Sequence, residues 1–180
     1  VVKSDGSIWF TDPSYGILSD YEGEQAIPEI PCQVYRISPE GELSCVASDF
    51  VMPNGLAFSP DESLLYISDT GASHDPDGPR HIRAMKLSDC GTQLHDAGIL
   101  AECSNGMFDG FRVDTGGRIW TSAADGVHCL NPDGQLIGKI HIPEWVANVT
   151  FGGAKLNRLF ICGTTSLYSS YLTVTGCTPG

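Results

Sequence analysis

The sequence predicts an all-β fold built from propeller-like blades. Short runs rich in Val, Ile, Tyr, Phe and Trp are separated about every ten residues by turn sequences such as Asp-Gly and Pro-Asp, which is typical of antiparallel strands. No sustained helical period interrupts them. The same four-strand unit also recurs in order along the chain, and such a repeat is the pattern of propeller blades.

The repeated unit consists of two hairpins in succession. The first hairpin occurs in four versions, at residues 1–16, 56–71, 111–126 and 149–166. A second hairpin follows each version, and after the fourth it lacks its outer strand. We therefore expect one propeller domain over residues 1–180, with blade-like units near 1–50, 51–103, 104–145 and 146–176. A two-sheet sandwich is the alternative, and it explains the many short strands but not their ordered repetition.

A propeller closes on itself and so leaves no free sheet edge, which about four blades of this kind do not achieve. The chain also opens with VVKSDG, inside a strand pattern and without an initiator Met. We therefore expect the natural protein to begin further upstream and this chain to lack its N-terminal blades. The segment 17–31 interrupts the first unit and is expected to form a surface loop, of a length that often serves as a lid.

The composition is that of a globular domain with an acidic surface. Hydrophobic residues make up 41% of the chain and charged residues 18%, enough for one packed core. The net charge of −12 argues against partners such as nucleic acid or anionic membranes, which bind through Lys and Arg. No apolar run is long enough to span a bilayer, so we expect a soluble protein. The compartment, cytoplasmic or periplasmic and secreted, stays open, as does the oligomeric state.

The seven cysteines are an odd number and form no C-x-x-C pair, which argues against a zinc knuckle or a redox dithiol. We expect most of them to be buried as small hydrophobic side chains. A disulfide between Cys32 and Cys45, across one expected hairpin, is the alternative.

Oxygen-bearing side chains recur just before the inner strand of successive units. They are Asn54 in PNGLAF, Asp109 in FDGFRV and, one residue out of step, Asn148 in ANVTF. At the same register of neighbouring inner strands, these side chains should converge on the propeller axis. Amide and carboxylate oxygens suit calcium or magnesium better than a thiolate-bound metal. The alternative is that an Asx residue before Gly only caps its own turn.

A second set of polar residues should lie on the same face, after the second strand of each unit. It comprises residues 12–15, 69–74, 125 and 164–166. Within it, Tyr15 and the loop that ends at His74 are candidates for contacts with substrate hydroxyls, and Tyr15 ranks above Asp12. The five histidines show no metal-ligand spacing, and no G-x-S-x-G sequence indicates a serine hydrolase. DTGG and FGG are interpreted as hairpin turns.

Four ordered motifs carry a family resemblance over nearly the whole chain. VVKSDGSIWFTDPSYG, PNGLAFSPDESLLYISDTG, DGFRVDTGGRIWTSAADGVHCLNPDGQLIGKI and FGGAKLNRLFICGTTSLY closely resemble the gluconolactonase branch of the senescence-marker/regucalcin-like lactonase family. The resemblance implies a six-bladed β-propeller, of which about four blades are present here. It also implies one catalytic divalent cation on the axis, held by a Glu, two Asn and an Asp. Asn54 and Asp109 match two of these ligands, and the others are expected upstream of Val1.

The function that follows is metal-dependent hydrolysis of a sugar lactone to its hydroxy acid. The cation would polarise the lactone carbonyl, and Asp109 would be the general base that takes a proton from the attacking water. Calcium is the first choice of cation, with magnesium, manganese or zinc as alternatives. Tyr15, Asn148 and His74 are the expected substrate contacts. The alternative functions are a non-catalytic propeller that binds a ligand or protein and a related metal-dependent esterase or organophosphate hydrolase.

Overall fold

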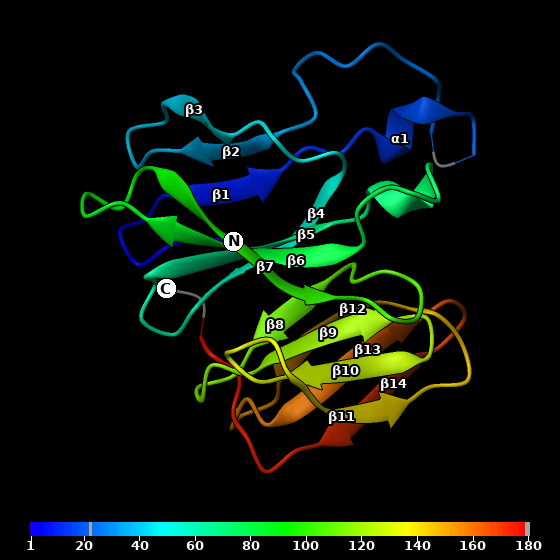
Figure 1. Ribbon diagram of the computed structural model, residues 1–180. Coiled ribbons are helices and arrows are strands. Elements are labelled where there is room, and N and C mark those ends of the chain that lie inside the picture. The colour runs from blue at the N-terminus through cyan, green and yellow to red at the C-terminus, as the bar shows by residue number, and fades with distance from the viewer. Residues whose placement is uncertain (22, 179–180) are drawn as a thin grey trace.

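The computed structural model describes residues 1–21 and 23–178, and these form an almost entirely β structure (Figure 1). The all-β prediction is confirmed. Helical structure within the described residues is limited to α1 (Tyr15–Leu18) and a single 3-10 turn at Gly71–Ser73. None of the described helical segments has the length and apolar character needed to cross a membrane.

The strands form four antiparallel sheets, each made of strands that follow one another in the chain. The first and second sheets comprise β1 (Ile8–Thr11), β2 (Val34–Ile37) and β3 (Leu43–Ala47), then β4 (Pro53–Phe58), β5 (Leu64–Asp69), β6 (His81–Leu87) and β7 (Leu94–Glu102). The third and fourth comprise β8 (Phe111–Val113), β9 (Ile119–Ala123), β10 (Gly126–Leu130) and β11 (Leu136–His141), then β12 (Val146–Gly152), β13 (Arg158–Gly163) and β14 (Leu167–Tyr171).

The first sheet has three strands where the sequence indicated four. The expected inner strand is reduced to an isolated bridge between Val2 and Ile8, with two backbone hydrogen bonds of 2.8 Å between Val1 and Trp9. Between these residues the chain turns through a hydrogen bond from the Gly6 N–H to the Lys3 carbonyl.

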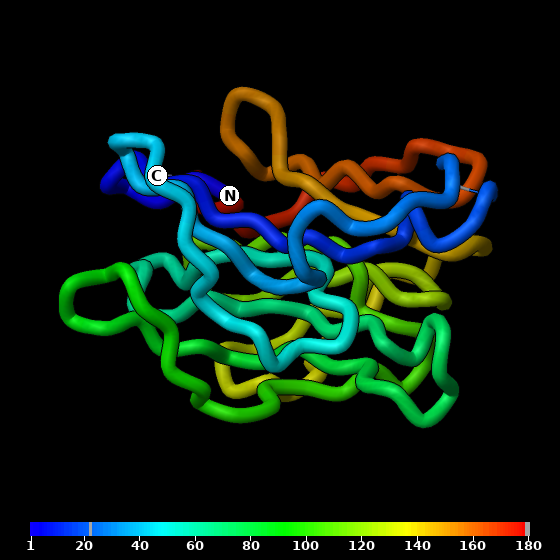
Figure 2. The backbone as a smooth tube through the Cα atoms, turned by 90° about the horizontal axis from the view of Figure 1, so that it is seen from above, coloured from blue at the N-terminus to red at the C-terminus, as the bar shows by residue number. Residues whose placement is uncertain are grey.

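The first strands of the four sheets lie next to one another in chain order, β1 beside β4, β4 beside β8 and β8 beside β12, although β1 corresponds to the second strand of its repeat unit. The described sheets follow one another without closing into a ring. In Figure 2, the blue first sheet and the orange-red last sheet lie on the same side of the molecule, above the green strands. The ends of the inner strands are therefore brought together, and this positions the site.

The core lies between the faces of adjacent sheets. In β5, Leu65 and Ile67 pack against the first sheet with Trp9 and Val34, whereas Tyr66 packs against Phe111 on the third. Successive residues of a strand point to opposite faces, so a sheet covered on both sides needs apolar residues at both. A further cluster, which includes Val127 and Val149, joins the third and fourth sheets.

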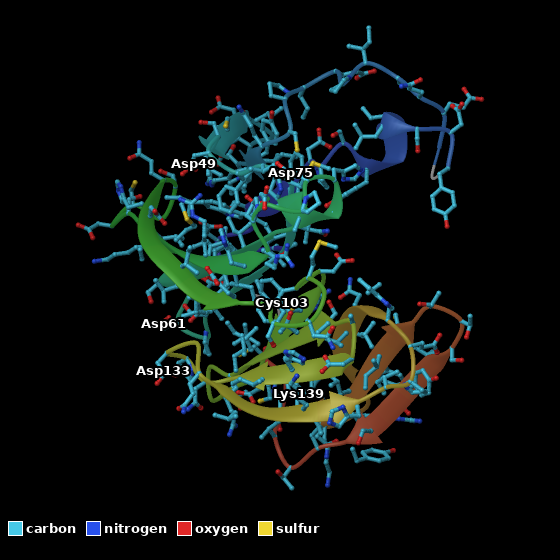
Figure 3. The ribbon with its side chains drawn as sticks, turned by 45° about the vertical axis from the view of Figure 1, so that its right-hand side comes forward. Asp49, Asp61, Asp75, Cys103, Asp133 and Lys139 are labelled. Carbon is cyan, nitrogen blue, oxygen red and sulfur yellow. The ribbon has the colours of Figure 1, made fainter. Side chains whose placement is uncertain are left out.

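The prediction that most cysteines are buried is wrong. All seven are free thiols, and of these only Cys103 and Cys129 are buried. Figure 3 shows Cys103 between the second and third sheets. Cys45, Cys90 and Cys162 are exposed, because they lie on an outer strand, in a hairpin turn and near the end of β13.

The alternative of a disulfide between Cys32 and Cys45 is also not realised. The Cys32 thiol lies 3.6 Å from the Val51 carbonyl oxygen, whereas the Cys45 sulfur lies 2.9 Å from Gln33 Oε1.

The insertion 17–31 begins within α1, a short helix that the sequence did not predict. It folds back on itself through a bond from the Ala26 N–H to the Ile17 carbonyl and another from the Gln25 N–H to the Asp20 carboxylate, both 3.1 Å. Ile27 is 91% exposed, as expected for a surface loop. Glu22, within this segment, lies outside the described residues, and a lid function stays a prediction.

Candidate active site

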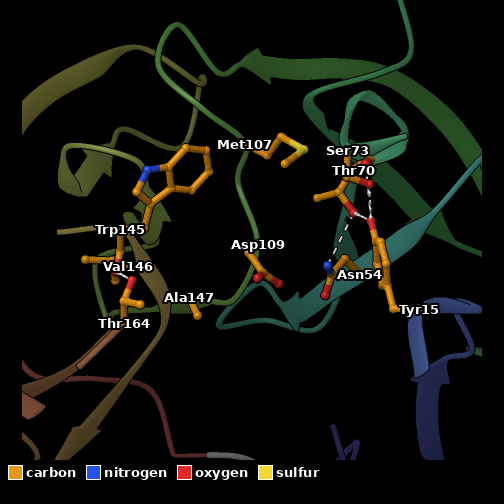
Figure 4. Close-up of a pocket in the computed structure, with 10 residues that line it drawn as sticks. All are labelled: Tyr15, Asn54, Thr70, Ser73, Met107, Asp109, Trp145, Val146, Ala147 and Thr164. Carbon is orange, nitrogen blue, oxygen red and sulfur yellow. Dashed lines mark hydrogen bonds between the residues drawn. The ribbon is translucent and has the colours of Figure 1, made fainter. Parts of the chain in front are cut away.

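A cavity of about 410 Å³ lies where the ends of the inner strands meet (Figure 4). Every sheet contributes to its wall, either at or just before the start of its first strand or just after the second strand of its repeat unit. The lining residues are Tyr15, Asn54, Thr70, Ser73, Met107, Asp109, Trp145, Val146, Ala147 and Thr164. Six residues of the two sets expected from the sequence are therefore brought together: Asn54 and Asp109 of the first set, and Tyr15, Thr70, Ser73 and Thr164 of the second.

Glycine follows the Asx residue in PNG and FDG because neighbouring sheets approach there. A Cβ atom on Gly55 would lie 2.1 Å from the Asp109 carbonyl oxygen, and one on Gly110 would lie 2.3 Å from the Asn148 side chain. Each glycine thus leaves room for the polar residue of the next sheet. The Asx-Gly pair is a packing requirement between sheets as well as a local turn.

Two fully buried serines hold the main chain of Asp109. Its N–H donates to Ser122 Oγ at 3.0 Å, and its carbonyl oxygen accepts from Ser68 Oγ at 3.0 Å. The Ser68 hydroxyl also lies 3.2 Å from the Gly55 carbonyl. The Asp109 backbone is therefore fixed to both the second and third sheets, while its partly exposed carboxylate faces the cavity beside Asn54.

Tyr15 lines the cavity with its ring, and its hydroxyl is bound within the protein. That oxygen lies 2.5 Å from Thr70 Oγ1 and 2.9 Å from Ser73 Oγ. His74 is exposed and outside the cavity wall, with its ring centre 5.5 Å from that of Tyr15 and its Nδ1 2.8 Å from Ser73 Oγ. A direct contact of the Tyr15 hydroxyl with substrate would compete with these bonds.

Asn148 lies beside the cavity rather than in its wall. The pairing of β12 with β13 shifts by one residue between Val146 and Asn148, so Ala147 takes the place facing the cavity. The Asn148 side-chain oxygen accepts the N–H of Val149 at 2.8 Å. This bulge is the physical origin of the one-residue offset seen in the sequence.

Other polar residues expected on this face are used structurally. The buried Asp69 carboxylate accepts the N–H groups of Val51, Met52 and Gly71. Burial opposes the charge of Asp125, but hydrogen bonds from Lys139 and His128 outweigh it and hold the pKa of this carboxyl far below its usual range. Burial in turn lowers the pKa of His128, despite its contact with Asp125.

Trp145 is a cavity residue that sequence reasoning missed. Its indole is 57% exposed, although its loop is firmly anchored. The Thr164 N–H donates to the Trp145 carbonyl at 3.0 Å, and the Glu144 carboxylate accepts from the Thr165 N–H and the Tyr168 hydroxyl. A rigidly held, exposed aromatic ring beside polar side chains is suited to contact with an organic ligand. No spacing in the sequence marks it.

The donor set of the cavity fits part of the shell of a hard cation. Asn54 and Asp109 supply amide and carboxylate oxygens, the ligand atoms that calcium and magnesium prefer. Over residues 1–21 and 23–178, no group of three or more His, Cys, Asp and Glu side chains could hold a metal ion. Any cation here would therefore depend on oxygen ligands beyond these two.

Fold and site together define a class: an all-β protein of consecutive antiparallel sheets whose inner strands converge on an oxygen-lined cavity. Residues 1–165 match the family described as the SMP-30/Gluconolactonase/LRE-like region, and the chain belongs to this family.

Two curated relatives are lactonases. The chain is 33% identical over 170 residues to the gluconolactonase of Zymomonas mobilis, covering 88% of this chain and 45% of that protein. It is 36% identical over 135 residues to the 6-deoxy-6-sulfogluconolactonase of Pseudomonas putida, covering 72% of this chain and 44% of that protein. The chain thus spans about half the length of the curated relatives it matches.

Among solved structures, the gluconolactonase of Xanthomonas campestris superimposes with a TM-score of 0.84 at 41% sequence identity. The match covers 97% of this chain and 55% of that one.

Proposed function

We propose that the whole protein hydrolyses a sugar lactone to its hydroxy acid with the help of one divalent cation. The observation that carries this proposal is that Asn54 and Asp109, at equivalent places in two repeats, face one cavity. A scaffold that only binds a partner has no need for such convergence. Membership of the family and the names of the lactonase relatives point to the same reaction.

Asp109 is the proposed general base. Its carboxylate takes a proton from the attacking water as the water oxygen adds to the lactone carbonyl carbon. The bond between that carbon and the ring oxygen then breaks, and Asp109 returns its proton to the released oxygen to give the hydroxyl of the product. The hydrogen bonds from Ser122 and Ser68 keep the Asp109 backbone in place during these steps.

Asn54 and Asp109 would together hold the cation, with calcium the first choice and magnesium, manganese or zinc the alternatives. When bound, such a cation polarises a carbonyl group and so favours attack by water.

The substrate is proposed to lie between Trp145 and the carboxylate of Asp109. The Trp145 indole offers an apolar face for the C–H groups of a sugar ring, and the Tyr15 ring lines the opposite part of the wall. Asn148 and His74 stay proposed contacts at the edge of the cavity.

We further propose that the four sheets are blades of a six-bladed propeller. The ordered repeat and the superposition on a longer gluconolactonase support this arrangement.

Hydrolysis of glucono-δ-lactone by the full-length protein, followed in a pH-stat, tests the function. Treatment with a chelator should abolish turnover, and added calcium, magnesium, manganese or zinc should restore it to different extents. Absence of lactone hydrolysis with every one of these cations would contradict the proposal. Hydrolysis of an aryl ester or an organophosphate, but not of the lactone, would favour the related esterase instead.

A further inference from the structure

We propose that Thr70 is a positioning residue that fixes the rotation of the Asn54 side-chain amide, so that the amide oxygen faces the cavity. Tyr15 supports Thr70 in this role. The inference deepens the proposed function, because an Asn side chain binds a cation only through its oxygen.

The Thr70 hydroxyl has one hydrogen to donate. Thr70 is 2% exposed, and its Oγ1 lies 3.1 Å from the Met52 carbonyl oxygen. A carbonyl cannot donate, so the single hydrogen of the Thr70 hydroxyl goes to Met52. Every other polar neighbour of this oxygen must then donate to it. The Tyr15 hydroxyl, 2.5 Å away, is such a neighbour, and it also lies 3.2 Å from the Thr70 carbonyl oxygen.

Because the Thr70 hydrogen is used for Met52, the Asn54 amide must donate to Thr70 through its NH₂ group. The amide atom next to Thr70 Oγ1, at 3.3 Å, has to be a donor and is therefore Nδ2. Its oxygen must then point the other way, and Figure 4 shows it turned from Thr70. This hydrogen bond joins the Asn54 side chain to Thr70. Loss of the Thr70 hydroxyl would let the amide rotate about its broad terminal torsion and present its NH₂ group to a cation.

Tyr15 connects this arrangement to the insertion. It is the first residue of α1, and its hydroxyl binds Thr70 and Ser73 across 55 and 58 positions of sequence. The segment that opens at Tyr15 is thus linked through one hydroxyl to the residue that orients Asn54. Tyr15 then acts on the site through Thr70 rather than through its own contact with a cation.

The test compares calcium binding by the full-length protein and its variants, measured by isothermal titration calorimetry. T70V keeps the size of the side chain and removes the hydroxyl, so it should weaken calcium binding about tenfold or more, the usual effect of removing a group that orients a metal ligand. T70S restores a hydroxyl and should bind within about twofold of wild type. T121V makes the same change at a fully buried threonine of β9 outside the cavity and should bind calcium as wild type does.

A double-mutant cycle tests the orientation itself. In N54D both side-chain oxygens can bind a cation, so adding T70V should weaken binding less than about twofold. An independent readout is the Asn54 side-chain NH₂ signal in NMR spectra, which should exchange slowly with solvent in wild type and T70S and rapidly in T70V. Thermal unfolding of each variant confirms that it is folded.

The outcomes separate the two proposals. An Asn54 NH₂ signal with the same protection in T70V as in wild type overturns the role of Thr70, as does equal calcium affinity of T70V and wild type. Wild-type protein that binds no divalent cation overturns the metal-dependent function instead, while the NMR comparison still decides whether Thr70 orients Asn54.

Discussion

Replacement of Gly55 by alanine tests the packing that brings the site together. The added Cβ would lie 2.1 Å from the Asp109 carbonyl oxygen, whereas ordinary contacts begin near 3.4 Å. The carbonyl would have to retreat by about 1 Å, and Ser68 resists this because its hydroxyl hydrogen is shared between the carbonyl oxygens of Gly55 and Asp109. We expect a loss of about 3 kcal/mol, the upper part of the usual range for overpacking, which lowers Tm by roughly 6–12 °C in a chain of this size.

Gly138 provides the matched control. It lies in β11, and a Cβ there would meet no atom within 4 Å, so G138A should change the free energy of unfolding by less than about 0.5 kcal/mol. Urea denaturation of the wild type and the two variants gives the comparison, and lactone hydrolysis should fall in G55A alone. If G55A and G138A unfold at the same urea concentration, the account of Asx-Gly packing is wrong.

Three further predictions concern other parts of the molecule. W145A should raise KM for the lactone about tenfold with little change in kcat, since a ring contact contributes about 1–1.5 kcal/mol. W145F should recover most of this loss. An unchanged KM in W145A would place the substrate elsewhere. Burial lowers the pKa of His128. As the pH falls through the unfolded pKa of about 6.5, the unfolded chain therefore binds more protons than the folded one and the protein loses stability; H128Q should show a shallower decrease in the free energy of unfolding, and an equal slope would refute this. Hydrogen bonds from the Ser88 and Thr92 hydroxyls lower the pKa of exposed Cys90 to about 7. At neutral pH, iodoacetamide should therefore alkylate Cys90 before Cys45 and Cys162, and S88A should slow the alkylation of Cys90. Mass spectrometry of the digested protein would show both effects.

The repeating strands could be predicted because their signals are local. Alternating apolar residues and turn sequences identify the hairpins, and the DTGG turn follows from a few neighbouring residues. Asp114 in that turn is fully buried and accepts the N–H groups of Gly116 and Arg118, while Gly117 adopts φ of 79°. Such features need no knowledge of other sheets.

The remaining parts of the site depend on packing between distant segments. Thr70 matters because Tyr15, 55 positions earlier, meets it, and Trp145 enters the cavity because the loop after β13 holds it there. The bulge that moves Asn148 out of register arises from the pairing of two strands. The exposure of Cys45 and Cys162 likewise follows from their places in the sheets, which residue type alone does not reveal.

The most direct test of the central claim is the turnover of D109N in the full-length protein at saturating cation. The substitution keeps the size of the side chain and removes its ability to take a proton, so lactone hydrolysis should fall by at least about a hundredfold. D12N is the matched control, because Asp12 lines a separate cavity beside α1, and it should retain wild-type turnover. A folded D109N protein that hydrolyses the lactone within about twofold of the wild-type rate would contradict the assignment of Asp109.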